Sequence, residues 1–495
     1  MPWLAASRAS SMIGRFLFVW RRAVDTPSLV IVVCAVMLLT GCASYEPAPI
    51  NPAQNADAIQ ARSLGDPQLH KFIAAATGAV EQKAQPSWDL TRLTLAALYY
   101  HPNLDIARAK LAEARAGVIT AQQVPNPSLS FEELSYNTTV ATPSPWTIAP
   151  IINFLIETFG KREYRTAAAQ DLAEAARDGL AAASWQVRGG VRTAMLSLWA
   201  AQDRLALLRQ KLELQNQLVT LLEHRFAVGE ASALDVARER TSRNQIGLAV
   251  RDTERQSIDA RAQLTTAIGI PARALDGVDL SFDAFEKPER PATDIATTAL
   301  RREALVNRPD VQGLLSEYAS AESALQLQIA NQYPNITLTA GYIYDAGQNK
   351  YQLYPGADLP IFNQNQGPIA EAVARREAVA ARFTALQTQI TDAVDRAAAN
   401  YRGATQAFTE ADMLLAGEKD REQRMLRSFQ AGEVDRPTLV AAQLERIAAA
   451  QSRFDTMVQQ RQALGALEDA LQHPFFASAM SVSPEKNPRA AAEPG

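Results

Sequence analysis

Two stretches of the chain follow the same plan. HPNLDIARAKLAEARAGVITAQQVPNPSLSF begins at His101, and RPDVQGLLSEYASAESALQLQIANQYPNITL begins at Arg308. The two align without a gap at an offset of 207 residues (308 minus 101), so that Pro127 pairs with Pro334. A repeat of this size is a supersecondary unit, and two copies indicate an internally duplicated, pseudo-symmetric fold.

The duplication continues downstream at an offset of 203 residues (429 minus 226). FAVGE, beginning at Phe226, matches FQAGE, beginning at Phe429. A glycine between two long antiparallel helices permits positive φ and ends the first helix. We therefore predict in each copy a helix, two strands, a long helix, a turn and a further helix.

The predicted organisation has five parts: 1–41 signal peptide, 42–86 linker, 87–292 repeat 1, 293–474 repeat 2 and 475–495 disordered tail. Strands are expected at about 127–159 and 334–362, and turns at 226–232 and 429–437. Hydrophobic content of 47% with a net charge of -4 indicates a folded chain, and no Lys/Arg block points to nucleic acid.

The long helix of repeat 1 is predicted from its periodicity. No proline occurs between Pro150 and Pro271. One stripe recurs at alternating spacings of three and four and is apolar except for Gln215: Leu205, Leu208, Leu212, Gln215, Val219, Leu222 and Phe226. A second apolar stripe runs beside it: Leu207, Leu214, Leu218 and Leu221. Two stripes imply two neighbouring helices, as in a layer of helices closed into a cylinder. From Lys161 to Arg225 such a helix spans about 95 Å.

The strand pairs alternate apolar and polar residues. In WTIAPIINFLIE, from Trp146, every second residue is apolar, and NITLTAGYIYD, from Asn335, alternates in the same way. Membrane-spanning strands need about 9–11 residues, apolar toward lipid and polar toward the lumen. A half-buried sheet of a soluble domain is the alternative. PSLSFEELSYN fits this pattern least, because strict alternation directs Glu133 to the face that meets lipid. Either this strand lies near the membrane interface, or a bulge shifts its alternation.

Four strands per chain cannot close a barrel. Unpaired strand edges are not tolerated in lipid, so the chain must oligomerise to satisfy them. Three chains would give twelve strands, an even number within the range of bacterial barrels.

The N-terminal segment reads as an export signal. An arginine-bearing region precedes an apolar run of about eleven residues, Leu29–Leu39, which is too short for a comfortable transmembrane helix. Leu39-Thr40-Gly41-Cys42 follows and resembles a bacterial lipobox, in which the Cys42 thiol receives diacylglycerol and acyl chains such as palmitate. The alternative is an anchor helix with an incidental cysteine. Met12 is a second candidate start.

These features together resemble the TolC family of outer-membrane efflux channels over about Trp88 to Pro474. ETFGKREYR, from Glu157, and LPIFNQNQGPIAEA, from Leu359, are similar to the lipoprotein branch serving heavy-metal exporters of the cobalt–zinc–cadmium type. The resemblance implies a mainly α chain forming a homotrimer, with a periplasmic α-barrel and a 12-stranded β-barrel in outer-membrane lipid. It also implies docking to a membrane-fusion adaptor and, through it, to an inner-membrane RND-type pump.

The resemblance also assigns roles at the two turns. The docking candidates are Phe226, Gly229, Glu230, Phe429, Gly432 and Glu433. Asp235 occupies the position of a family aspartate that keeps the tip closed, and the expected partners are Arg427 or Arg436. An exposed aspartate near a helix start is equally explained by the helix dipole. Phe429 lacks the hydroxyl of the family's tyrosine, so the gate is expected to differ in detail.

No catalytic or metal-binding motif is recognisable, so neither an enzyme, a cofactor nor a resident metal is predicted. The chain has no P-loop, H-E-x-x-H or G-x-S-x-G sequence. Its four histidines are scattered, and its cysteines, Cys34 and Cys42, lie close to the N-terminus.

Two other functions remain open at this point. One is a drug or organic-compound channel of the same family, because substrate choice resides mainly in the pump. The other is a lipid-anchored periplasmic scaffold of α-hairpins, which would need no spanning strands.

Overall fold

The computed structural model describes residues 45–77, 87–139, 143–286 and 297–475. The chain divides into two compact units at Ala58 and Ile59, and the second unit carries all the described strands and long helices. No helix within these ranges combines the length and the apolar composition needed to cross a membrane.

The predicted duplication is confirmed by the order of the elements. The first copy contains α5 (Leu90–Tyr100), α6 (Pro102–Gln122), β1 (Ser128–Tyr136), β2 (Trp146–Ile156), α7 (Lys161–Ala227) and α8 (Ala233–Ile268). The second contains α10 (Thr297–Asn307), α11 (Pro309–Ala330), β3 (Ile336–Asp345), β4 (Gln348–Ala357), α12 (Gln366–Gln430) and α13 (Arg436–Leu471). Outside the repeat lie α3 (Pro52–Gln60), α4 (Pro67–Thr77), the 3₁₀ turn η1 (Ala272–Leu275) and α9 (Asp283–Glu286).

Local sequence explains where the repeated helices begin. Proline stands at the first position of α6 and of α11, where its missing N–H is not needed. The side chain of Ser232 caps α8, and that of Asp435 caps α13 at the equivalent position. α8 and α13 therefore start and end 203 residues apart, and each is 36 residues long.

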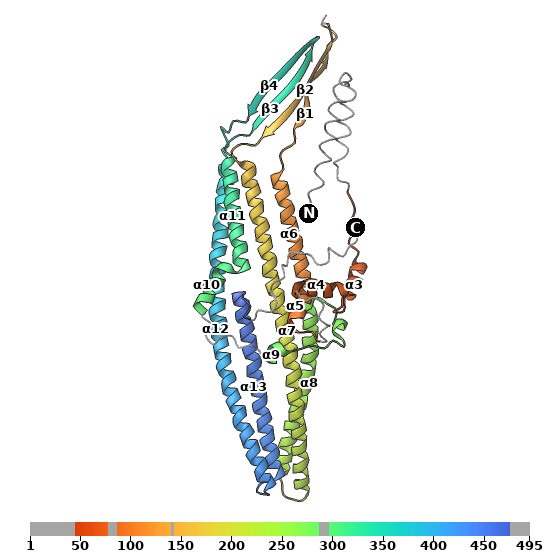
Figure 1. Ribbon diagram of the computed structural model, residues 1–495, viewed down its shortest axis with the longest axis vertical. Helices are drawn as coiled ribbons and strands as arrows, with labels where there is room; N and C mark the ends of the chain where they lie inside the picture. Colours follow the sequence, from red (N-terminus) through yellow and green to blue (C-terminus); the bar gives the residue numbers. More distant parts are fainter. Residues whose placement is uncertain (1–44, 78–86, 140–142, 287–296, 476–495) are drawn as a thin grey trace, which may run out of the picture. The chain divides into compact units, whose positions relative to one another are not determined.

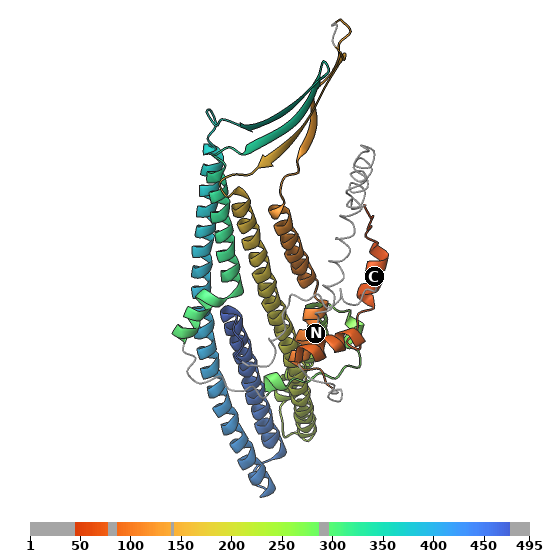
Figure 2. The same ribbon diagram turned by 45° about the horizontal axis from the view of Figure 1, so that its top comes forward.

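The helices form one layer in each chain. α7 contacts α6 and α8 on one side and α11 and α13 on the other, and α12 lies beyond α11 and α13 (Figure 1; Figure 2). The main apolar core lies where α5 and the 272–286 segment cover α7, and its largest fully buried side chain, Trp199, contacts the rings of Phe285 and Phe454. A smaller core joins α10, α12 and α13 around Ile390 and Val394.

The sheet is antiparallel in the order β1-β2-β3-β4. β1 and β4 are its edges, which agrees with the predicted need for strands from other copies. The two central strands, β2 and β3, belong to different repeats and pair along their length. β3 and β4 are joined by two residues with positive φ, Ala346 and Gly347, as in a type I′ hairpin.

A β-bulge resolves the register of β1. The pairing with β2 shifts between Phe131 and Glu133, which leaves Glu132 unpaired. Phe131 and Leu134 therefore both lie on the apolar face, and Glu133 pairs with Ala149 on the polar face. Of the two possibilities left open by the sequence, the bulge is the one present. The one-sided sheet also counts against the scaffold alternative, which needs no strands.

Candidate functional site: the helical turns and the mid-helix cluster

The two turns between the long helices have the same backbone geometry. Gly229 has φ +82° and Gly432 has φ +79°, the left-handed conformation that favours glycine. The amide of Glu230 donates to the Arg225 carbonyl at 2.8 Å, and the amide of Glu433 donates to the Ser428 carbonyl at 2.9 Å. A Cβ at either glycine would meet no atom within 4 Å, so backbone conformation and not crowding requires glycine there.

The side chains at the two turns differ. At the first turn three apolar residues are solvent-exposed, and we call them the turn 1 patch: Phe226 (50%), Val228 (71%) and Leu234 (67%). At the second turn the guanidinium of Arg436 lies 5.6 Å from the ring centroid of Phe429, which is only partly exposed. The first turn therefore presents an apolar surface, and the second a partly covered and charged one.

An ion pair joins the two turns. Arg225, at the end of α7, lies 2.8 Å from the carboxylate of Asp435, which caps α13. The backbone amide of Thr438 donates to Asp435 at 2.9 Å and its hydroxyl at 2.6 Å. These two hydrogen bonds are the main cause that lowers the pKa of Asp435, and the positive charge of Arg225 lowers it further. The carboxylate therefore stays ionised at neutral pH.

The expected partners of Asp235 differ from those in the structure. The Ser232 hydroxyl donates to the Asp235 carboxylate at 2.7 Å, which lowers its pKa. In the described part of this single chain, neither Arg427 nor Arg436 pairs with Asp235, so the pairing stays a prediction for contacts between copies. Sequence reasoning missed Arg225–Asp435, although Asp435 stands 203 residues after Ser232, at the same capping position.

A second polar feature lies midway along the helices and was also missed. Arg192 on α7 lies 2.5 Å from Glu468 and 2.5 Å from Asp469, both on α13, and donates to the Gly465 carbonyl at 2.7 Å. Only 10% of the Arg192 side chain and 3% of the Glu468 side chain are exposed. This buried ion cluster connects the first repeat to the second. Burial raises the pKa of Asp469, and the nearby Arg192 opposes that shift.

Two glycines make room for the cluster. A Cβ on Gly465 would come within 2.6 Å of the Arg192 guanidinium, and one on Gly189 within 2.9 Å of the Asp469 carboxylate. Both lie within long helices, where glycine is otherwise unfavourable by about 1 kcal/mol relative to alanine. These two positions are therefore explained by close packing around the charged groups.

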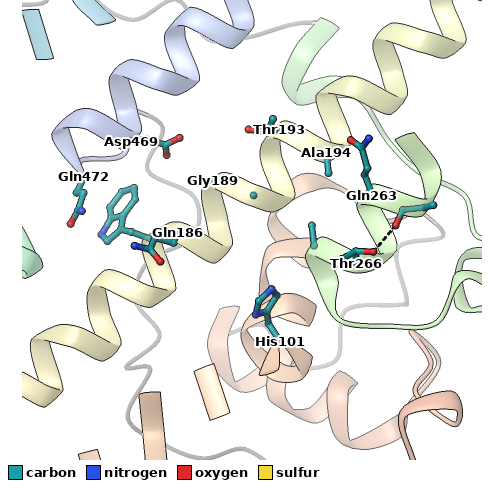
Figure 3. A pocket seen from close by; sticks show the side chains of 13 residues that line it. His101, Gln186, Gly189, Thr193, Ala194, Gln263, Thr266, Asp469 and Gln472 are labelled. Carbon is teal, nitrogen blue, oxygen red and sulfur yellow. Dashed lines mark hydrogen bonds between the residues drawn. The ribbon is translucent and has the colours of Figure 1, made fainter. Parts of the chain in front are cut away.

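An open hollow of about 770 Å³ adjoins the cluster. Side chains from α7, α8 and α13 surround it, including Gln186, Gln263 and Asp469 (Figure 3). His101 also lines the hollow, and its ring caps α6 by accepting from the Asn103 amide. Burial lowers the His101 pKa, so the ring is neutral at neutral pH, as this acceptor role requires.

The described residues contain no group of three or more His, Cys, Asp or Glu side chains placed to hold a metal ion. The candidate lipidation site, Cys42, lies outside the described residues. The turns and the mid-helix cluster are thus the sites that the structure defines.

Comparison with known proteins shows what the chain is similar to. The family described as outer membrane efflux protein matches residues 94–270. The cobalt-zinc-cadmium resistance protein CzcC of Cupriavidus metallidurans is 26% identical over 58% of this chain and 67% of its own length. The pyoverdine export outer membrane protein OpmQ of Pseudomonas aeruginosa is 25% identical over 68% of this chain and 73% of its own length.

Solved structures of outer-membrane channels have a similar fold. A crystal structure of CusC superposes with a TM-score of 0.62 and 19% identity, covering 81% of this chain and 96% of CusC. The match therefore covers a larger share of the chain than the 177 residues of the family match. The chain is thus similar to outer-membrane efflux proteins: residues 94–270 match that family, and the fold resembles that of solved outer-membrane channels.

Proposed function

We propose that three copies of this chain form the exit duct of a tripartite efflux system for heavy-metal cations. The observation that best supports a duct is the four-stranded sheet, which has an apolar face, a polar face and, within the described part of one chain, two unpaired edges. Three such sheets close a twelve-stranded barrel whose polar face lines the lumen. The duct is passive, and an inner-membrane RND-type pump supplies the energy.

The cargo is inferred from the relatives. The match to CzcC, a cobalt-zinc-cadmium resistance protein, favours divalent metal cations. The match to OpmQ, a pyoverdine export protein, favours an organic cargo as the second candidate. The chain itself would not bind the ion in transit, because a duct needs a lined lumen and no resident ligand set.

The turns are proposed as the adaptor-docking surface. The turn 1 patch is apolar and exposed, and the candidates Gly229, Glu230, Gly432 and Glu433 lie on the same two turns. Exposed apolar patches rimmed by charge mark protein interaction sites. The Arg225–Asp435 pair between the turns is proposed to hold the tip closed within each copy, and Asp235 stays a candidate for contacts between copies.

Anchoring is proposed at Cys42. The Leu39–Cys42 sequence fits a lipidation site, and acyl chains there would hold the mature N-terminus in outer-membrane lipid. The periplasmic helices would then extend from the barrel toward the adaptor.

A deletion strain tests the duct and its cargo together. Loss of the gene should reduce growth on zinc, cobalt and cadmium, and the wild-type gene should restore it. A Phe226→Asp variant should reach the outer membrane in normal amount but fail to restore growth, because it places a charge in the turn 1 patch. Unchanged metal tolerance with new sensitivity to dyes would instead assign the organic cargo.

Arginine substitutions in β1 test which face meets lipid. Phe131→Arg should destabilise the inserted protein by about 2–4 kcal/mol, because an arginine facing the bilayer midplane costs that much. Ser130→Arg, one residue away on the polar face, should change stability little. The measurement is urea unfolding in lipid vesicles. Equal effects of the two substitutions would refute the assignment of the faces.

A further inference from the structure

The polar face of the sheet has an excess of negative charge. On the four described strands the charged side chains are Glu132, Glu133, Asp345 and Lys350. The Lys350 ammonium lies 2.9 Å from the Asp345 carboxylate, so these two charges compensate each other. Three acidic residues against one basic residue leave each chain with two net negative charges, which are those of Glu132 and Glu133 on β1.

A row of paired residues shows on which face Glu132 lies. Ser130, Ile151, Gly341 and Gln352 pair in this order across the sheet from β1 to β4. A Cβ on Gly341 would lie 2.9 Å from Cγ and 2.8 Å from Nε2 of Gln352, so the glutamine side chain lies over Gly341 on the polar face. Its amide donates to the Glu132 carboxylate at 2.9 Å. The Glu132 carboxylate is therefore on the polar face too.

The β-bulge is the reason that two consecutive glutamates share one face. In a regular strand neighbouring side chains point to opposite faces, so one of the two would meet lipid. At the bulge two residues of β1 oppose one residue of β2, here Ala149. The Ser135 hydroxyl, two residues further along the same face, donates to the Glu133 carboxylate at 2.7 Å. Both carboxylates thus lie side by side on the polar face.

Acidic side chains that ring a pore favour the passage of cations. We propose that Glu132 and Glu133 form such a ring, with two carboxylates from each of three chains at one level of the barrel, and that this ring sets the cation preference of the barrel. The inference rests on the proposed function. It places a determinant of ion preference in the strands, separated from the helical turns by the length of α7. The ring acts on ions in transit through its electric field and holds none of them.

A purely structural role for Glu132 is the alternative. The hydrogen bond from Gln352 braces β1 against β4, and a glutamine at position 132 would offer the same acceptor oxygen at the same length. Glu132→Gln therefore keeps the brace and removes the charge. A change in electrostatic potential on this substitution separates the two roles.

Charged thiol reagents measure the potential beside the ring. Ser130→Cys places a thiol on the polar face about 7 Å along β1 from Glu132. The purified protein in detergent is treated with a methanethiosulfonate that carries either a trimethylammonium or a sulfonate group, and modification is followed by mass spectrometry. After correction for their rates with a free thiol, the positive reagent should react at least about five-fold faster, as two nearby charges predict at moderate salt. About 1 M salt should reduce this preference.

Substitutions that change the charge should shift the preference in opposite directions. Glu132→Gln with Glu133→Gln should bring the two corrected rates to within about two-fold of each other. Lys350→Gln leaves Asp345 uncompensated and should increase the preference for the positive reagent. Asp345→Asn with Lys350→Gln removes one charge of each sign and should leave the preference close to that of the parent.

Thr337→Cys is the matched control for position. Thr337 is on the polar face of β3 opposite Leu155, six residues along β2 from the Ala149 that Glu133 faces. This separation is about 20 Å, or two Debye lengths at moderate salt. The two glutamine substitutions should therefore change the preference at this thiol by less than about two-fold. The parent protein without an added cysteine gives the background rate.

The outcomes separate this inference from the proposed function. Equal corrected rates at Ser130→Cys, or a preference that persists after both glutamine substitutions, would overturn the ring and leave the duct intact. A thiol at this position that reacts with neither reagent until the protein is unfolded would show that the polar face lines no water-filled lumen. That result, like a monomer by native mass spectrometry, would overturn the proposed duct itself.

Discussion

Replacing Arg192 with methionine should lower the free energy of unfolding by about 3–5 kcal/mol, the cost of leaving a buried carboxylate without its partner. Glu468 is 3% exposed, and its ion pair with Arg192 is 2.5 Å long, whereas its approach to Arg188 is 3.7 Å. Arg188 therefore replaces Arg192 poorly. The measurement is thermal or denaturant unfolding of the purified protein in detergent, followed by circular dichroism.

Arg204→Met is the matched control. Arg204 also joins α7 to α13, through Asp455 at 2.6 Å, but its side chain is 38% exposed and that of Asp455 is 45% exposed. A solvent-exposed ion pair contributes about 0–1 kcal/mol, so this variant should unfold nearly as the wild type does. If the two variants lost similar amounts of unfolding free energy, burial would not be the reason that the Arg192 cluster stabilises the protein.

Breaking the pair between the turns should open the duct. Asp435→Ala removes the cap of α13, worth about 1 kcal/mol, and the partly exposed ion pair with Arg225, worth less than that. A change of 1–2 kcal/mol shifts a closed-to-open ratio by about 5–30-fold. We expect longer openings in planar lipid bilayers.

Two further variants separate the contribution of the α13 cap from that of the ion pair. Asp435→Asn keeps an amide oxygen for the Thr438 amide but removes the charge, and Arg225→Gln removes the opposite charge. Both should open the duct less than Asp435→Ala does. Because the pKa of Asp435 is lowered, the pair persists at neutral pH and is lost only as pH falls below the ordinary aspartate value of about 3.9. If Asp435→Ala conducted like the wild type, the pair would have no part in gating.

The sequence predicted the fold well because its evidence is periodic and local. Repeated offsets, helical stripes and alternating strands depend on neighbouring residues, and capping residues such as Ser232 fix where helices begin. The sequence alone could not predict which residues of β1 face lipid, because one extra residue in a bulge reverses the alternation beyond it. The structure locates that bulge between Phe131 and Glu133. From the sequence, Glu132 and Glu133 are equally able to be the extra residue.

The sites were harder to predict because they depend on distant contacts. Arg192 and Glu468 are 276 residues apart, and nothing near either residue marks it as buried. The predicted gate pairing is not formed within one chain for a related reason. Arg436 is close to the second turn in sequence, but its guanidinium lies over the Phe429 ring, and Arg225 reaches Asp435 from the other repeat.

The two strand hairpins end in connections of unequal length, nine residues (137–145) between β1 and β2 and two residues between β3 and β4. In an assembly of three copies, this end of the barrel would therefore alternate three nine-residue connections with three two-residue hairpins. An engineered tag is better inserted in the nine-residue connection between β1 and β2, because the two-residue β3–β4 hairpin requires fixed backbone angles that an insertion would change.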